Sequence, residues 1–109
     1  MNVIINTRHM DATPAIRDYV NEKVQKLPRF FEALTDVEVV LAPEAEHHVT
    51  EIVAHGPRKH TFVATHQATD LYASVDGCID KIVEQLRRHK DRVRDRQGPP
   101  HPNAQGGIA

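Results

Sequence analysis

The sequence contains no tryptophan and only 5% aromatic residues, so a hydrophobic core must consist mainly of valine, isoleucine, leucine and alanine. Its single cysteine, Cys78, excludes an internal disulfide bond. No stretch approaches the roughly 18 apolar residues of a membrane span, and the N-terminal segment MNVIINTRHMD lacks the basic region and long apolar core of a secretory signal. These absences predict a soluble protein of a reducing compartment, most simply the cytoplasm, with no membrane partner.

Lysine and arginine are missing from the segment Glu32–Glu51, which is acidic, whereas the segment Gln85–Arg96 has six cations and two carboxylates. The second segment therefore has a local charge of +4, although the whole chain has a formal net charge of −1. Its cations are Arg87, Arg88, Lys90, Arg92, Arg94 and Arg96. This segregation of charge favours an anionic partner on one side of the protein only.

Hydrophobic periodicity predicts two helices and four strands. The first helix begins at Thr13, which is a good N-cap, and it ends at Pro28. The second helix is capped by Asp70, and its apolar seam runs from Tyr72 to Val93. The hairpin loop Gly56–Lys59 joins the last two strands. The four predicted strands are Asn2–Thr7, Val37–Leu41, His48–His55 and His60–His66.

The order of these elements predicts an α+β fold of the form β-α-β-β-β-α. A right-handed first crossover makes the first two strands parallel, and the later strands continue as antiparallel hairpins. Because each helix has one apolar stripe, we expect both helices to pack on one face of a four-stranded sheet. Residues 1–95 form a single domain on this interpretation, and residues 96–109, which are rich in proline and glycine, form a disordered tail.

At about 100° per residue, Lys81, Arg88 and Arg92 fall in one column of the second helix, well away from the apolar seam. If the two helices lie side by side, these cations can merge with those of the first helix into a surface that binds phosphates. The alternative is a solvated helix end, stabilised by the Glu84–Arg88 pair and by the helix dipole. The residues alone leave both interpretations open.

The segments TPAIRDYVNEKVQKL (Thr13–Leu27) and DLYASVDGCIDKIVEQLRRHKDRV (Asp70–Val93) resemble the two helices of the bacterial ribosome hibernation-promoting factor family. This family includes the ribosome-associated inhibitor A proteins, and its members have been described as sigma-54 modulation proteins. The resemblance covers roughly residues 1–95 and rests most specifically on DLYASVD, the following DK and QLRRHK. The chain is similar to the short form of the family, because it ends before the second, ribosome-dimerising domain of the long form.

The resemblance implies a protein without catalysis, cofactor or small-molecule substrate, which is monomeric when free. It implies binding to whole ribosomes, at the rRNA of the decoding region of the small ribosomal subunit. Translation would be silenced there, under stress or in stationary phase, because mRNA and tRNA are kept out. The rRNA-binding positions that carry over from the family are Lys23, Lys26, Arg29, Lys81, Arg87, Arg88, Lys90 and Arg92.

Two other classes of function remain open at this stage. A general double-stranded RNA-binding module can use the same basic helices to recognise the shape of a duplex. A small enzyme or metal protein would use the histidines of the predicted hairpins, although no fixed ligand spacing supports such a site. The histidines concerned are His47, His48, His55, His60 and His66.

Four further residues have simple structural interpretations. Cys78 lies in the middle of a helix beside the seam, which favours a small buried hydrophobe over a nucleophile. Gly77 is costly inside a helix, so we expect it to allow a close approach of the two helices. Tyr19 and Tyr72 lie on the apolar stripes, and we expect both to pack in the core rather than to stack on bases.

Overall fold

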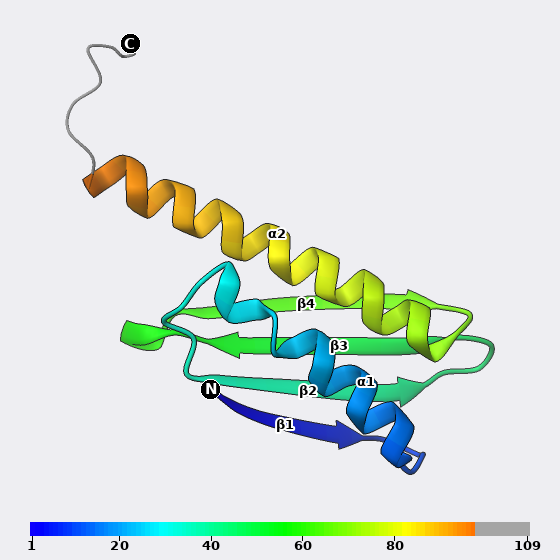
Figure 1. Cartoon of the computed structure of the whole chain (residues 1–109). Coiled ribbons are helices and arrows are strands. Elements are labelled where there is room, and N and C mark those ends of the chain that lie inside the picture. The colour runs from blue at the N-terminus through cyan, green and yellow to red at the C-terminus, as the bar shows by residue number, and fades with distance from the viewer. Residues whose placement is uncertain (98–109) are drawn as a thin grey trace.

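The computed structural model describes the backbone of residues 1–97 and the side chains as far as Arg92. Its elements follow the predicted order β-α-β-β-β-α, with two short 3-10 turns between them (Figure 1). Helix α2 extends to Gln97, and the rest of the predicted tail lies outside the described residues. The elements are β1 (Asn2–Thr7), α1 (Pro14–Val24), η1 (Leu27–Arg29), β2 (Asp36–Pro43), β3 (His48–His55), η2 (Pro57–Lys59), β4 (Thr61–Ala68) and α2 (Leu71–Gln97).

The four strands form one sheet in the order β1-β2-β3-β4. Strands β1 and β2 are parallel, with Val3 opposite Val37, and the other two pairs are antiparallel. These pairings confirm the predicted parallel first pair of strands and the two antiparallel hairpins. Both helices lie on the same face of the sheet, and α2 continues past the ends of the strands (Figure 1).

The core lies between the sheet and the two helices, and alternate residues of the inner strands point into it. In β2 the burial pattern alternates strictly from Asp36 to Leu41, with Val37, Val39 and Leu41 almost fully buried. Burial of each such side chain contributes about 1.5–3 kcal/mol to the stability of the fold. The helices supply the matching apolar stripes, whose fully buried members are Val20, Val24, Val75, Cys78, Ile82 and Leu86.

Both helices begin at the predicted caps. The Thr13 hydroxyl accepts a hydrogen bond from the backbone N–H of Ile16 at 3.2 Å. The Asp70 carboxylate accepts hydrogen bonds from the N–H groups of Tyr72 and Ala73, each at 3.3 Å. These bonds satisfy backbone donors that have no partner within the helix, and such a cap typically contributes about 1 kcal/mol.

The expected end of the first helix, at Pro28, is wrong by one turn. Helix α1 ends at Val24, and Pro28 lies inside the 3-10 turn η1. Proline has no backbone N–H and disfavours the helical conformation of the residue before it, so the helix closes earlier and the chain tightens into the turn.

Two expectations about packing are also wrong. Tyr72 is 39% exposed instead of buried, and its ring packs against the Tyr19 ring in a T-shaped arrangement, with 4.8 Å between centroids. Gly77 allows the approach of α2 to strand β4 rather than to the other helix. A Cβ atom on Gly77 would lie 2.1 Å from Cδ2 of His66 in β4, so only glycine leaves room for this imidazole.

Within residues 1–97, neither helix is long and apolar enough to cross a membrane.

Candidate nucleic-acid interface

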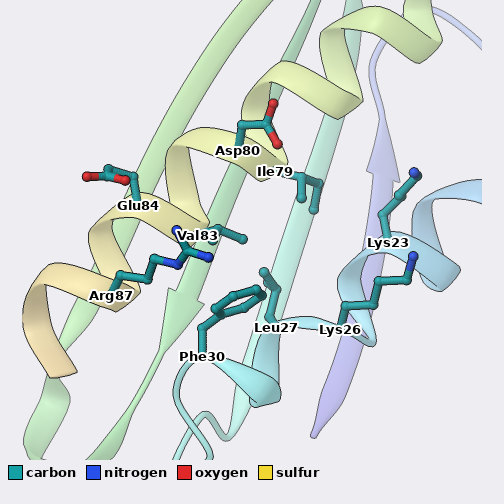
Figure 2. Close-up of a pocket in the computed structure, with 9 residues that line it drawn as sticks. All are labelled: Lys23, Lys26, Leu27, Phe30, Ile79, Asp80, Val83, Glu84 and Arg87. Atoms are coloured by element: carbon teal, nitrogen blue, oxygen red, sulfur yellow. The ribbon is translucent and has the colours of Figure 1, made fainter.

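A groove with a volume of about 470 Å³ runs between the two helices, and it collects charged side chains from both of them (Figure 2). Its floor is apolar, with Leu27 and Phe30 from the segment after α1, and Ile79 and Val83 from α2. The helices therefore lie side by side, as the merging of their cations requires. The charged residues along the groove are Lys23, Lys26, Asp80, Glu84 and Arg87.

Lys23 is positioned by a small network that joins the two helices. Its ammonium lies 4.0 Å from the Asp76 carboxylate and 5.3 Å from the centroid of the Tyr19 ring. The Tyr19 hydroxyl donates a hydrogen bond of 2.5 Å to the same carboxylate. This bond retains the phenolic proton and, with burial and the charge of Asp76, raises the pKa of Tyr19 to about 12. The network ties α1 to α2 and so fixes one end of the groove.

Arg87 stands on the opposite wall, on α2. The carbon of its guanidinium lies 5.3 Å from the centroid of the Phe30 ring, a cation–π contact worth about 0.5–1 kcal/mol at an exposed site. In Figure 2 the Arg87 side chain points across the groove toward Phe30, while Lys23 and Lys26 stand on the α1 side. Cations from segments about sixty residues apart in the chain thus border one cavity.

Two carboxylates interrupt the positive charge on α2. Asp80 and Glu84 line the groove and also line a second depression, of about 490 Å³, on the side of α2 that faces β4. Glu84 forms the predicted ion pair with Arg88, with Oε1 and Nε 3.3 Å apart. Because both side chains are more than half exposed, the pair contributes only about 0.3–0.5 kcal/mol. Asp80 and Glu84 thus separate the cations of the groove from Lys81 and Arg88.

The column that contains Lys81 is exposed to solvent, but it lies beside the outer edge of the sheet. The Lys81 ammonium donates a hydrogen bond to the backbone carbonyl of Thr65 at 2.8 Å, and the Gln85 amide donates to that of Val63 at 2.6 Å. Both carbonyls belong to the edge strand β4. Lys81 therefore has a structural contact already, which competes with any phosphate for its charge.

The remaining predicted binding residues are exposed at the periphery. Arg29 lies in the turn η1, and Lys90 and Arg92 lie on α2 beyond Leu86, which is the last fully buried residue among the described side chains of the helix. This part of α2 extends past the sheet (Figure 1). The structure thus brings together Lys23, Lys26 and Arg87, places Lys81 and Arg88 beside β4, and leaves the other three on outward surfaces.

The sequence did not reveal that Phe30 belongs to this interface. Phe30 follows the 3-10 turn, so it has no place in the helical periodicity of α1. A signal was nevertheless present, because two aromatic residues directly after Leu27-Pro28-Arg29 are unusual in a chain with so few aromatics. Only the close approach of α2 makes Phe30 part of the floor of a groove.

The histidines do not gather into a metal site within the part of the chain that the structure describes, where no group of three potential ligands has suitable geometry. His48 and His55 stand at opposite ends of β3, opposite Ala68 and Thr61 of β4. The His60 ring instead packs against the His89 ring of α2, with 4.2 Å between centroids.

Cys78 is fully buried, which confirms its interpretation as a small core residue. Its thiol donates a hydrogen bond to the backbone carbonyl of Ala64 at 3.3 Å. Burial raises the pKa of this thiol to about 12, so it is protonated at neutral pH and is not activated as a nucleophile.

Comparison with known families gives a match over almost the whole described chain. The family described as Sigma 54 modulation protein / S30EA ribosomal protein matches residues 3–94. The ribosome hibernation promoting factor of Salmonella typhimurium is 36% identical over 96 residues, which cover 86% of this chain and 98% of that protein. The protein of the same name from Azotobacter vinelandii is 36% identical over 97 residues, covering 89% of this chain and 90% of its own length.

Two solved structures have the same fold. The N-terminal domain of Thermus thermophilus Protein Y superposes with a TM-score of 0.74 at 30% identity, covering 82% of this chain and 99% of that domain. A ribosomal subunit interface protein from Coxiella burnetii superposes with a TM-score of 0.78, covering 84% of this chain and 99% of that chain. At 19% identity, the second comparison supports the fold alone.

Proposed function

Because the chain belongs to the family of Sigma 54 modulation proteins and S30EA ribosomal proteins, we propose that it is a ribosome hibernation factor, which binds whole ribosomes and silences translation under stress or in stationary phase. The observation that carries this proposal is the 36% identity to the Salmonella typhimurium hibernation factor over 98% of that protein's length. The likeness extends over the whole relative and is not confined to one motif. The family consists of ribosome-associated binding proteins, and the proposed action requires no catalysis.

The proposed binding site is the rRNA of the decoding region of the small subunit, between head and body. The distribution of charge supports an orientation with the helices toward the RNA. The four strands contain no lysine or arginine, whereas the cations that line the groove come from α2, from α1 and from the segment directly after α1. A phosphate backbone is attracted to the helical side and is repelled by the carboxylates of β2 and β3.

In this proposal the protein silences translation only by the space that it occupies. A folded domain lodged in the decoding region occupies the space of mRNA and tRNA, and ribosomes are held inactive for as long as it stays bound. The protein acts in the cytoplasm, where ribosomes are found, and it is a monomer before it binds. Its eight proposed rRNA contacts are Lys23, Lys26, Arg29, Lys81, Arg87, Arg88, Lys90 and Arg92.

The proposal is tested in a cell-free translation system to which purified protein is added. Inhibition should reach completion near one molecule of protein per ribosome, and the protein should compete with initiator tRNA for the small subunit. Saturating protein that leaves tRNA binding unchanged would show that the decoding region is the wrong location.

Specificity for ribosomes needs a separate measurement. The protein should sediment with purified ribosomes in the presence of a large excess of unrelated duplex RNA. If the duplex RNA removes it from the ribosome pellet, the protein is a general double-stranded RNA-binding module instead.

A further inference from the structure

The groove between α1 and α2 has a feature that binding to a phosphate backbone does not require. Backbone binding depends on positive charge and releases counterions, and it makes no use of an aromatic ring or an apolar floor. Here the cations surround Phe30 and three aliphatic side chains, Leu27, Ile79 and Val83 (Figure 2). We propose that this groove receives one unpaired RNA base, which stacks on Phe30. The inference rests on the proposed function, since the RNA in question is ribosomal.

The size of the groove is consistent with a single base. Its volume of about 470 Å³ lies within the range of about 300–1,000 Å³ that small-molecule sites occupy. A base that is paired and stacked inside a duplex cannot enter a groove between two helices. The RNA element must therefore be a bulge, a loop or a strand end, whose bases are free to be splayed out and stacked on protein side chains.

Phe30 and Arg87 bind different parts of the nucleotide. The guanidinium of Arg87 now covers the Phe30 ring at 5.3 Å from its centroid. An incoming base takes that position, because stacking of a base on an aromatic ring is stronger than a cation–π contact at an exposed site. Arg87 is then free to bind the adjoining phosphate, because the donors of its planar guanidinium match the geometry of phosphate oxygens. Lys26, exposed on the facing wall, meets the phosphate on the other side of the base.

Asp80 gives the site a preference among bases, whereas Glu84 is paired with Arg88 and points away from Phe30 (Figure 2). Asp80 repels phosphates, so it marks the part of the groove into which the base edge points. Carboxylates accept hydrogen bonds from exocyclic amino groups, which adenine, cytosine and guanine have and uracil lacks. The site should therefore bind an unpaired uracil more weakly than the other three bases.

The test compares two RNA hairpins that differ only by a single bulged base in the stem. The bulged base is aminopurine, a fluorescent analogue of adenine, and binding is measured by anisotropy of a terminal dye. The bulged hairpin should bind about tenfold more tightly than the fully paired one, which is a moderate value for one stacked base. The aminopurine emission should also be quenched on binding. Equal affinities for the two hairpins, without quenching, would overturn the proposal.

Two variants and one matched control assign the effect to the groove. Phe30→Leu keeps an apolar side chain but removes the ring, and Val83→Phe fills the groove while Phe30 and the charges stay in place. Each should abolish the advantage of the bulged hairpin and retain the affinity for the paired one. The control is Tyr72→Leu, which removes an exposed ring of α2 outside the groove and should preserve the advantage. An advantage that survives in both groove variants, with native circular dichroism spectra, would refute stacking on Phe30.

Sedimentation of the same native protein with ribosomes separates this inference from the proposed function. Ribosome binding without an advantage for the bulged hairpin rejects the base site and retains the function. An advantage for the bulged hairpin without ribosome binding supports the base site and rejects the function.

Discussion

Replacement of Gly77 by alanine should destabilise the protein, although the same change in an ordinary helix stabilises it by about 1 kcal/mol. The added Cβ would lie 2.1 Å from Cδ2 and 2.7 Å from Cγ of His66. Ordinary contact begins near 3.4 Å, so the ring or the helix must move by about 1.3 Å. Rotation of the ring does not suffice, because Cγ lies on the axis of that rotation and is itself too close.

Strain of this kind in a packed interior costs about 1–3 kcal/mol, which exceeds the gain in helix propensity. We therefore expect Gly77→Ala to lower the free energy of unfolding by about 1 kcal/mol, which corresponds to about 4–8 °C in the melting temperature of a domain of this size. Urea denaturation followed by circular dichroism measures the change directly. The His66→Ala variant provides the matched background, because it removes the ring that the new methyl group meets.

The sign of the effect should reverse in that background. Gly77→Ala should stabilise the His66→Ala protein by about 1 kcal/mol, since only helix propensity then remains. The two measurements form a double-mutant cycle whose coupling energy reports the contact between α2 and β4. The reasoning is refuted if Gly77→Ala stabilises both backgrounds equally.

Four further outcomes are expected. Arg88→Glu together with Arg92→Glu should reduce ribosome affinity in sedimentation assays far more than it reduces stability, because each lost phosphate contact also removes counterion release. The control replaces the two glutamates of the β2–β3 turn by lysine, and this change should not weaken ribosome binding. Lys81→Ala should lower the free energy of unfolding by about 0.5–1 kcal/mol in urea, since a hydrogen bond to the β4 edge is lost. Cys78, with a pKa raised to about 12 by burial, should resist iodoacetamide until the protein unfolds, and equally rapid labelling of native and unfolded protein would contradict its burial. Tyr19 should ionise near pH 12 in an ultraviolet titration, at a higher pH than an ordinary phenol. Because the folded state holds this proton, the contribution of Tyr19 to stability should be complete below about pH 10 and should fall as the pH rises toward 12.

The fold could be predicted largely from the sequence because its signals are local. Thr13 and Asp70 cap the helices as expected, and the alternation of apolar residues in β2 shows which face is buried. The strand order follows from one helical crossover, which joins the parallel strands β1 and β2, and from two short hairpin connections. Each of these features depends on a few neighbouring residues, so the linear sequence is sufficient.

Features that depend on which elements meet could not be read in the same way. Periodicity shows that Gly77 lies on the packed side of α2, but not that its neighbour is His66 of β4 instead of α1. Tyr72 lies on the apolar stripe, yet it is 39% exposed and packs against the ring of Tyr19 on α1. The column of Lys81 was correctly placed away from the seam, but its bond to a backbone carbonyl of β4 depends on the tilt of the helix across the sheet.

The hydrogen bonds from α2 to β4 have a consequence for the behaviour of the protein at high concentration. An edge strand with open carbonyl groups is a template on which a second chain can add a strand, and this is a common route to aggregation. Lys81 and Gln85 occupy two of those carbonyls, and the ammonium also places a charge where a new strand would have to lie. The helix that carries the basic residues thus also covers part of the β4 edge, and this cover should reduce self-association through added strands when the protein is concentrated.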